Sequence, residues 1–240
     1  MPLVGITSTS FYAGMRTVLA PTAPGVPVLQ FLNGDFESGF ENWEFFNQQV
    51  SPGGEIPSAL TTAVGCPIPA DPTPKPPLEN GYAGSISQTT FIRTTYFRTI
   101  IVPDGPSGNY VELSNKGSVE RLRGGQVFGP MLVSKNPVVA EEGDRISFNW
   151  TAKGGGDAYN VLAYIIDPNQ SCKHFIMVDA TGDNTNATLP WTTVSKIIEP
   201  GEAGNYYFVF ICGTVDWSFG GATGSALGVD SIVIEKAGTY

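Results

Sequence analysis

The chain has 240 residues, of which only 15% are charged, and its formal net charge is −9. This length suits one large β domain or one domain with extended arms, and the negative charge argues against nucleic-acid binding, which needs clustered Lys and Arg. No apolar run approaches the ~18 residues that a membrane-spanning helix needs, so we expect no membrane partner. Because a charged fraction of ~25% is typical of soluble domains, the low value indicates a surface partly covered by other protein.

The first 30 residues follow neither the strand period nor the helix period. Pro21, Pro24 and Pro27 recur at every third position, which favours an extended and solvated backbone. We therefore interpret residues 1–30 as an N-terminal arm. The arm has neither a basic start nor a continuous apolar stretch, so it is not predicted to be a signal peptide.

The folded domain is expected over residues 31–236, followed by a short tail at 237–240. Residues 33–37 are interpreted as the opening strand of a sandwich, and 43–46 with 48–50 as a second short strand. Residues 51–80 then break the strand pattern with six prolines between 67 and 77. Long Pro-rich loops of this kind are usually functional or disordered, so we interpret this segment as an excursion from the sandwich.

The second half of the chain alternates between apolar and polar residues. Within 145–150 the residues Ile146, Phe148 and Trp150 are expected to face the core. Residues 206–211 are apolar on both faces, which is typical of a central strand covered on both sides. Further strands are expected within 86–101, 109–113, 126–133, 159–166, 175–178, 191–198 and 227–234. Many short strands with Gly/Pro turns and no helical period predict an all-β, antiparallel β-sandwich.

The cysteines and the single histidine offer little catalytic chemistry. Three cysteines cannot all pair within one chain, and we expect no disulfide. Cys212 lies in an apolar strand and is predicted to be a buried thiol. Cys172 and His174 alternate along a strand, but no orienting motif surrounds them, so we expect no nucleophile there. One histidine and no well-spaced cysteines also argue against zinc. We therefore predict that the chain is not an enzyme.

Several short motifs carry a resemblance to a known group of domains. They are Asn33-Gly34-Asp35-Phe36-Glu37 with Trp43, the segments 143–150, 157–161 and 213–216, the pair Gly220-Gly221, and Val229-Asp230-Ser231-Ile232. Together they resemble the carbohydrate-binding-module-like, or galactose-binding-like, jelly-roll domains. The resemblance implies a jelly-roll β-sandwich with the first and last strands side by side. Such domains occur in extracellular glycan-active enzymes, in surface proteins and in the virions of tailed phages, and fold alone does not choose among them.

The resemblance also implies a structural calcium ion that ties the first strand to the last. Its ligands here would be Glu37 and Asp230, joined by Asp35, since calcium prefers hard carboxylate oxygens. The alternative is that these acids are solvated at strand ends or accept hydrogen bonds from a turn. No other cofactor is expected.

Aromatic residues in loops are the remaining candidates for a binding site. Trp217 and Tyr82 lie in Gly-containing loops, where they either stack on sugar rings or contact a neighbouring subunit. The other three tryptophans, Trp43, Trp150 and Trp191, occur in strand patterns and are expected in the core.

Two functions follow from these features. The first is a non-catalytic structural protein of a tailed-phage virion, as a head decoration, neck or tail component, with other virion proteins as partners in a homo-oligomer or lattice. The two Pro-rich segments would bind neighbouring chains through six apolar residues: Phe11, Tyr12, Leu19, Val28, Ile56 and Leu60. The alternative is a carbohydrate-binding module that attaches to a glycan or a cell surface outside the cell. The two overlap where a virion protein binds a host glycan.

Overall fold

A computed structural model of the chain describes residues 31, 33–47, 65–66, 92–119, 126–156, 158–182, 187–215 and 224–238. Within these ranges the chain forms strands and no helix, and it contains no helix long and apolar enough to cross a membrane. The strands are β1 (Trp43–Phe46), β2 (Ile92–Gly105), β3 (Gly108–Val119), β4 (Gln126–Ser134), β5 (Val138–Ala140), β6 (Arg145–Gly154), β7 (Ala158–Asp167), β8 (Lys173–Thr181), β9 (Thr192–Ile197), β10 (Gly204–Val215) and β11 (Ser225–Glu235).

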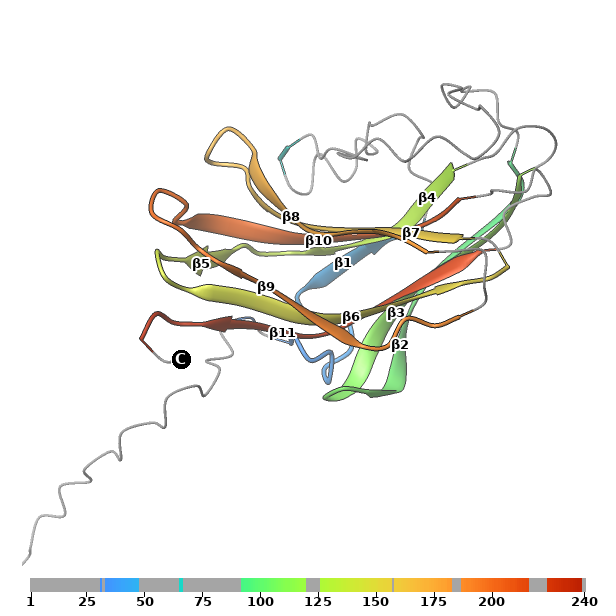
Figure 1. Ribbon diagram of the computed structural model, residues 1–240, viewed down its shortest axis with the longest axis horizontal. Helices are drawn as coiled ribbons and strands as arrows, with labels where there is room; N and C mark the ends of the chain where they lie inside the picture. The colour runs from blue at the N-terminus through green and yellow to red at the C-terminus, as the bar shows by residue number, and fades with distance from the viewer. Residues whose placement is uncertain are drawn as a thin grey trace, which may run out of the picture.

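The strands form two sheets that lie as two layers (Figure 1). The six-stranded sheet has the order β1-β4-β10-β7-β8, and β5 also pairs with β10. The five-stranded sheet has the order β2-β3-β11-β6-β9. Every pairing is antiparallel. The predicted all-β antiparallel sandwich is therefore confirmed.

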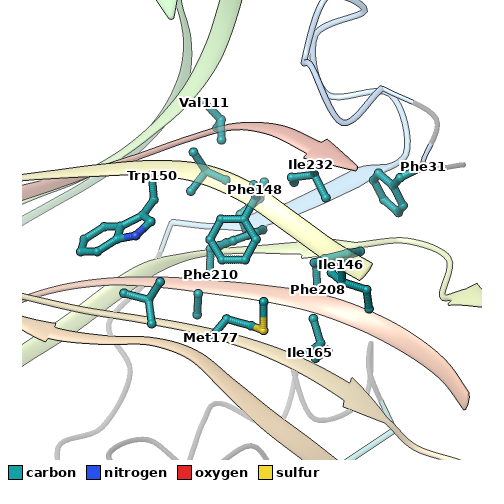
Figure 2. Packing of buried hydrophobic residues seen from close by; sticks show 14 of the residues in the cluster. Phe31, Val111, Ile146, Phe148, Trp150, Ile165, Met177, Phe208, Phe210 and Ile232 are labelled. Atoms are coloured by element: carbon teal, nitrogen blue, oxygen red, sulfur yellow. The ribbon is translucent and has the colours of Figure 1, made fainter. Parts of the chain in front are cut away.

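The core fills the space between the two layers. Ile146, Phe148 and Trp150 of β6 all belong to it, as the alternation predicted. Phe148 packs edge-on against Phe210 of the facing sheet with ring centroids 5.1 Å apart (Figure 2). Because side chains alternate across a strand, this period-2 pattern decides which face of the sheet is buried.

Strand β10 lies at the centre of the six-stranded sheet and is buried on both faces. Phe208 and Phe210 point into the core, whereas Val209 and Ile211 belong to a second apolar cluster on the outer face of the same sheet. Cys66, from the Pro-rich segment, belongs to that outer cluster as well. The expectation of a central strand covered on both sides is confirmed.

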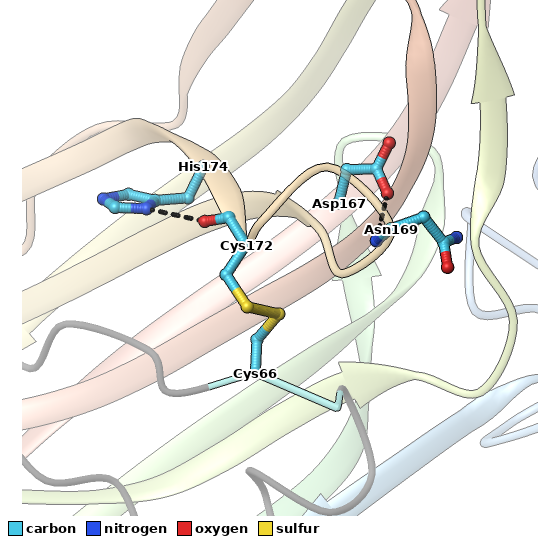
Figure 3. Close-up of a disulfide and its surroundings, with 5 residues drawn as sticks. All are labelled: Cys66, Asp167, Asn169, Cys172 and His174. Carbon is cyan, nitrogen blue, oxygen red and sulfur yellow. Dashed lines mark hydrogen bonds between the residues drawn. A yellow bond between two sulfur atoms is a disulfide. The ribbon is translucent and has the colours of Figure 1, made fainter.

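The expectation of no disulfide is wrong, because Cys66 is bonded to Cys172 with a Cα–Cα distance of 5.7 Å (Figure 3). The bond joins the Pro-rich segment to the turn before β8. Cys212 remains a buried free thiol, as predicted, and burial raises its pKa to about 12. His174 Nδ1 lies 3.2 Å from the carbonyl oxygen of Cys172, whose sulfur is oxidised and therefore provides no thiolate nucleophile.

The expected opening strand at 33–37 is also wrong, because residues 33–42 form a series of turns. Asn33 has a φ of 63°, which a strand does not allow. Its amide nitrogen donates to the carbonyl oxygens of Gly39 and Glu41, both at 2.8 Å, and its Oδ1 accepts from the Ser38 N–H at 2.8 Å. We call residues 33–42 the entry loop. The expectation that this segment lies beside the closing strand is correct, since the Ile232 N–H of β11 donates to the Gly34 carbonyl oxygen at 2.9 Å.

Candidate functional site

The outer face of the five-stranded sheet carries the most distinctive group of side chains among the described residues. Val111 and Leu113 of β3 point into the core. Because side chains alternate along a strand, Tyr110 before them and Glu112 between them point outward. On β11 the core residues Leu227 and Val229 flank Gly228, which faces the same way as Tyr110. In the sheet, Gly228 pairs with Glu112 on one side and with Thr151 of β6 on the other.

Tyr110 and Trp191 meet over Gly228. Their ring centroids are 5.1 Å apart, with an interplanar angle of 84°. A Cβ atom on Gly228 would lie 3.1 Å from Trp191 Cη2, 3.2 Å from Tyr110 Cε2 and 2.7 Å from Thr151 Cγ2. The bare backbone of Gly228 therefore forms the floor under both rings. We call Tyr110 and Trp191 the aromatic pair; both side chains are partly exposed.

The expectation that all three strand-pattern tryptophans lie in the core is confirmed for two of them. Trp43 is 1% exposed and Trp150 is 9% exposed. Trp191 is not part of the core, because it lies one residue before β9 and its ring extends back over the outer face toward Gly228. The strand alternation that places Trp150 does not apply outside a strand.

Polar side chains surround the aromatic pair on the same face. Asn149 of β6 accepts a hydrogen bond on its Oδ1 from the Thr193 hydroxyl of β9 at 2.6 Å. The Thr151 hydroxyl donates to the Leu189 carbonyl oxygen, which fixes the segment that leads to Trp191. Arg98 and Lys153 are exposed on the neighbouring row of the face, where they pair in register with Ser114 and Ala226. The face therefore combines a small apolar platform with hydrogen-bonding side chains, some of them neutral, some positively charged and one, Glu112, negatively charged.

The phenol of Tyr110 stays protonated at physiological pH. Burial raises its pKa above the ordinary value of 10.0, and the carboxylates of Glu112 and Asp104 raise it further. A neutral phenol keeps its O–H as a hydrogen-bond donor while its ring offers an apolar surface. Tyr110 is thus able to contact both the apolar face and the hydroxyl edge of one ligand.

The predicted calcium ligands Glu37 and Asp230 are brought to the same place, the turn between β2 and β3. Glu37 accepts hydrogen bonds from Asn109 N–H at 2.6 Å and from Asn109 Nδ2 at 3.2 Å. Asp230 is buried and accepts from Ser107 N–H at 2.9 Å, from Ser107 Oγ at 2.7 Å and from Ser231 N–H at 2.6 Å.

Asp35, the third predicted ligand, accepts from the Glu37 N–H at 3.4 Å. Across the described ranges, no three His, Cys, Asp or Glu side chains are grouped so as to hold a metal. Hydrogen-bond donors face the oxygens of Glu37 and Asp230, so these residues do not fit a calcium shell by themselves. The acids occupy the alternative role that the sequence left open, as acceptors for a turn, and calcium stays an untested prediction.

The other predicted site residues lie outside the described ranges. This holds for the two loop aromatics, Trp217 and Tyr82, and for the six apolar residues of the Pro-rich segments: Phe11, Tyr12, Leu19, Val28, Ile56 and Leu60. Sequence reasoning missed the aromatic pair. The signals that it contained were Tyr110 at an outward position of its strand and a glycine, Gly228, at an outward position of the closing strand.

Carbohydrate-binding modules with a β-sandwich fold are among the solved structures that are similar to this chain. The family 11 module of the cellulosomal cellulase Lic26A-Cel5E of Clostridium thermocellum is 14% identical; the match covers 90% of this chain and 96% of that chain, with a TM-score of 0.36. TmCBM61, solved in complex with β-1,4-galactotriose, is 12% identical and covers 87% of this chain and 99% of that chain, with a TM-score of 0.41.

A phage protein is similar as well. The enzymatically active domain of tailspike protein 4 of bacteriophage CBA120 is 13% identical, and the match covers 86% of this chain but 21% of that chain, with a TM-score of 0.37. No protein-family model matches the sequence, and no curated protein sequence does. Carbohydrate-binding modules, which the sequence motifs resemble, are thus among the solved structures that are similar to this chain.

Proposed function

We propose that this chain is a non-catalytic glycan-binding protein whose site is the outer face of the five-stranded sheet. The observation that supports it is the aromatic pair, in which Tyr110 and Trp191 meet over the bare backbone of Gly228. The alternative function drawn from the sequence, a carbohydrate-binding module, is thus favoured over a purely structural role.

The chemistry of a sugar ring suits this arrangement. A pyranose has an apolar C–H face and a rim of hydroxyl groups, and Tyr and Trp combine an apolar ring with a polar tip. Rings that are partly exposed on a strand face accept the C–H face by stacking. The side chains of Glu112, Asn149 and Lys153, which lie on the same face, supply acceptors and donors for the hydroxyl rim.

The disulfide supports action outside a reducing cytosol. Disulfides persist in secreted and surface proteins and are rare where thiols are kept reduced. The Cys66–Cys172 bond therefore agrees with an extracellular or cell-surface location. A virion location stays a prediction, because the Pro-rich segments on which it depends lie almost wholly outside the described residues.

Affinity electrophoresis against neutral polysaccharides tests the proposal. The panel contains mixed-linkage β-glucan, xylan, galactan and galactomannan, and we expect at least one to retard the wild-type chain. Tyr110→Ala and Trp191→Ala should each abolish the retardation. Phe45→Ala, which removes an exposed aromatic side chain from β1 of the other sheet, is the matched control and should bind like the wild type. Equal binding by all four proteins would contradict the proposed site.

A further inference from the structure

The turn between β2 and β3 is held by two carboxylates from distant parts of the chain. Glu37 reaches it from the entry loop and binds Asn109, whereas Asp230 reaches it from β11 and binds Ser107. The last register pair of the hairpin is Gly105 with Gly108, so the two acids hold the residues at and just after its tip. We call residues 105–109 the hairpin tip.

The glycines of the hairpin tip leave room for the carboxylates. A Cβ atom on Gly108 would overlap Glu37 Oε1, and one on Gly105 would lie 2.9 Å from Asp230 Oδ2. Gly108 also has a φ of +129°, which L-residues rarely adopt. The backbone here is thus shaped to let two charged oxygens approach the turn closely.

The same tip supports one ring of the aromatic pair. Tyr110 follows Asn109 directly, and the Asn109 N–H is the donor that Glu37 holds. Tyr110 also packs back on the tip, since a Cβ atom on Gly105 would lie 2.9 Å from Tyr110 Cβ and 3.1 Å from Tyr110 Cδ1. A displaced tip would therefore displace the ring that lies over Gly228.

We propose that Glu37 and Asp230 are positioning residues of the glycan site, which clamp the hairpin tip and fix Tyr110 through direct hydrogen bonds with no metal ion. The positioning role rests on the proposed function. The clamp itself stands on the hydrogen bonds and on the absence of a metal-ligand group among the described residues. Preorganising a ring before the ligand arrives lowers the free-energy cost of binding.

Hydrogen exchange of the full chain without ligand tests the clamp. Glu37 is exposed, so Glu37→Ala should leave the core folded while the Asn109 amide exchanges at least about tenfold faster, because a charge-assisted hydrogen bond is lost. Glu37→Gln, which keeps one acceptor oxygen, should restore most of the protection. Glu44→Ala, at an exposed acid of β1, is the control and should change nothing at the tip. Faster exchange of the Ser107 and Asn109 amides in wild-type chain treated with EDTA would show a metal at the tip and overturn the proposal.

Binding to the polysaccharide that retards the wild type tests the positioning role. Glu37→Ala should weaken that binding about threefold to tenfold, and Glu37→Gln should recover it. Loss of binding in Trp191→Ala with unchanged binding in Glu37→Ala would overturn the positioning role and leave the proposed function intact. No binding by the wild type to any member of the panel would overturn both, whereas the exchange measurement would still decide whether the clamp exists.

Discussion

The buried carboxylate of Asp144, next to the start of β6, is 2.7 Å from the Nζ of Lys236, just after the end of β11. Asp144 is 1% exposed, and it also accepts from Glu141 N–H at 2.8 Å and Ala237 N–H at 3.0 Å. Burial alone would raise the pKa of Asp144. The hydrogen bonds and the charge of Lys236 outweigh burial and hold this pKa below the ordinary value for an aspartate. Asp144 therefore holds Lys236 and Ala237, which follow β11, against the start of β6.

We predict that Asp144 makes the chain lose stability in acid. Because its folded pKa lies below the unfolded value of about 3.9, the unfolded state binds more protons in between. The stabilisation is complete above the unfolded pKa and is lost as pH falls through the folded pKa. Asp144→Asn should cost about 1.5–3 kcal/mol at pH 7 and flatten the stability profile below about pH 4. Urea unfolding from pH 3 to pH 7 measures this, with Glu44→Gln as a surface control; an equally steep profile in Asp144→Asn would contradict it.

Gly228→Ala should weaken glycan binding about tenfold with little change in melting temperature. The added methyl would lie within 3.2 Å of both rings of the aromatic pair and 2.7 Å from Thr151 Cγ2, so the rings must separate. A side chain in a strand interior otherwise tends to stabilise it relative to glycine. Affinity electrophoresis and thermal melting on the same sample separate the two effects. Ala226→Ser, on the same strand and face, is the control, and unchanged binding in Gly228→Ala would rule out Gly228 as the floor of the site.

The elements that the sequence predicted well are those whose side chains repeat with period 2. Residues 145–150 alternate between polar and apolar side chains, and Tyr206 to Ile211 is apolar throughout, so the core-facing residues Ile146, Phe148 and Trp150 followed directly from the sequence. The strand predicted at 33–37 was wrong for a local reason. Asn33 and Phe36 both have positive φ, and a buried aromatic such as Phe36 looks the same in sequence whether a strand or a turn presents it.

The candidate site was less accessible to sequence reasoning because it combines three distant segments. Tyr110, Gly228 and Trp191 come from β3, β11 and the approach to β9, and only the order of the strands in the sheet brings them together. The disulfide is similar, since Cys66 and Cys172 are separated by 106 residues and carry no local spacing signal.

Loss of the disulfide should destabilise the chain by about 2–5 kcal/mol, because cross-links that close long loops restrict the unfolded chain most. Cys66→Ser, Cys172→Ser and wild type with reductant should unfold at similar, lower urea concentrations. Reductant should have no further effect on either variant. Cys212→Ala, at the buried free thiol, is the control that must remain sensitive to reductant. If the wild type unfolds at the same urea concentration with and without reductant, under conditions that reduce the bond, the disulfide does not stabilise the chain.

Asn33→Ala should cost about 2–4 kcal/mol, because the entry loop loses three side-chain hydrogen bonds and alanine tolerates the φ of 63° poorly. Asn33→Gly separates the two causes, since glycine adopts this backbone freely but makes none of the hydrogen bonds. We expect Asn33→Gly to recover only the backbone part, about 1 kcal/mol of the loss. The loop also supports Trp43, whose Nε1–H donates to the Asn33 carbonyl oxygen at 3.0 Å, so both variants should change the environment of that indole in the near-ultraviolet circular dichroism spectrum. If urea unfolding finds Asn33→Gly as stable as the wild type, the hydrogen bonds contribute nothing, and the preference for Asn33 is one of backbone conformation alone.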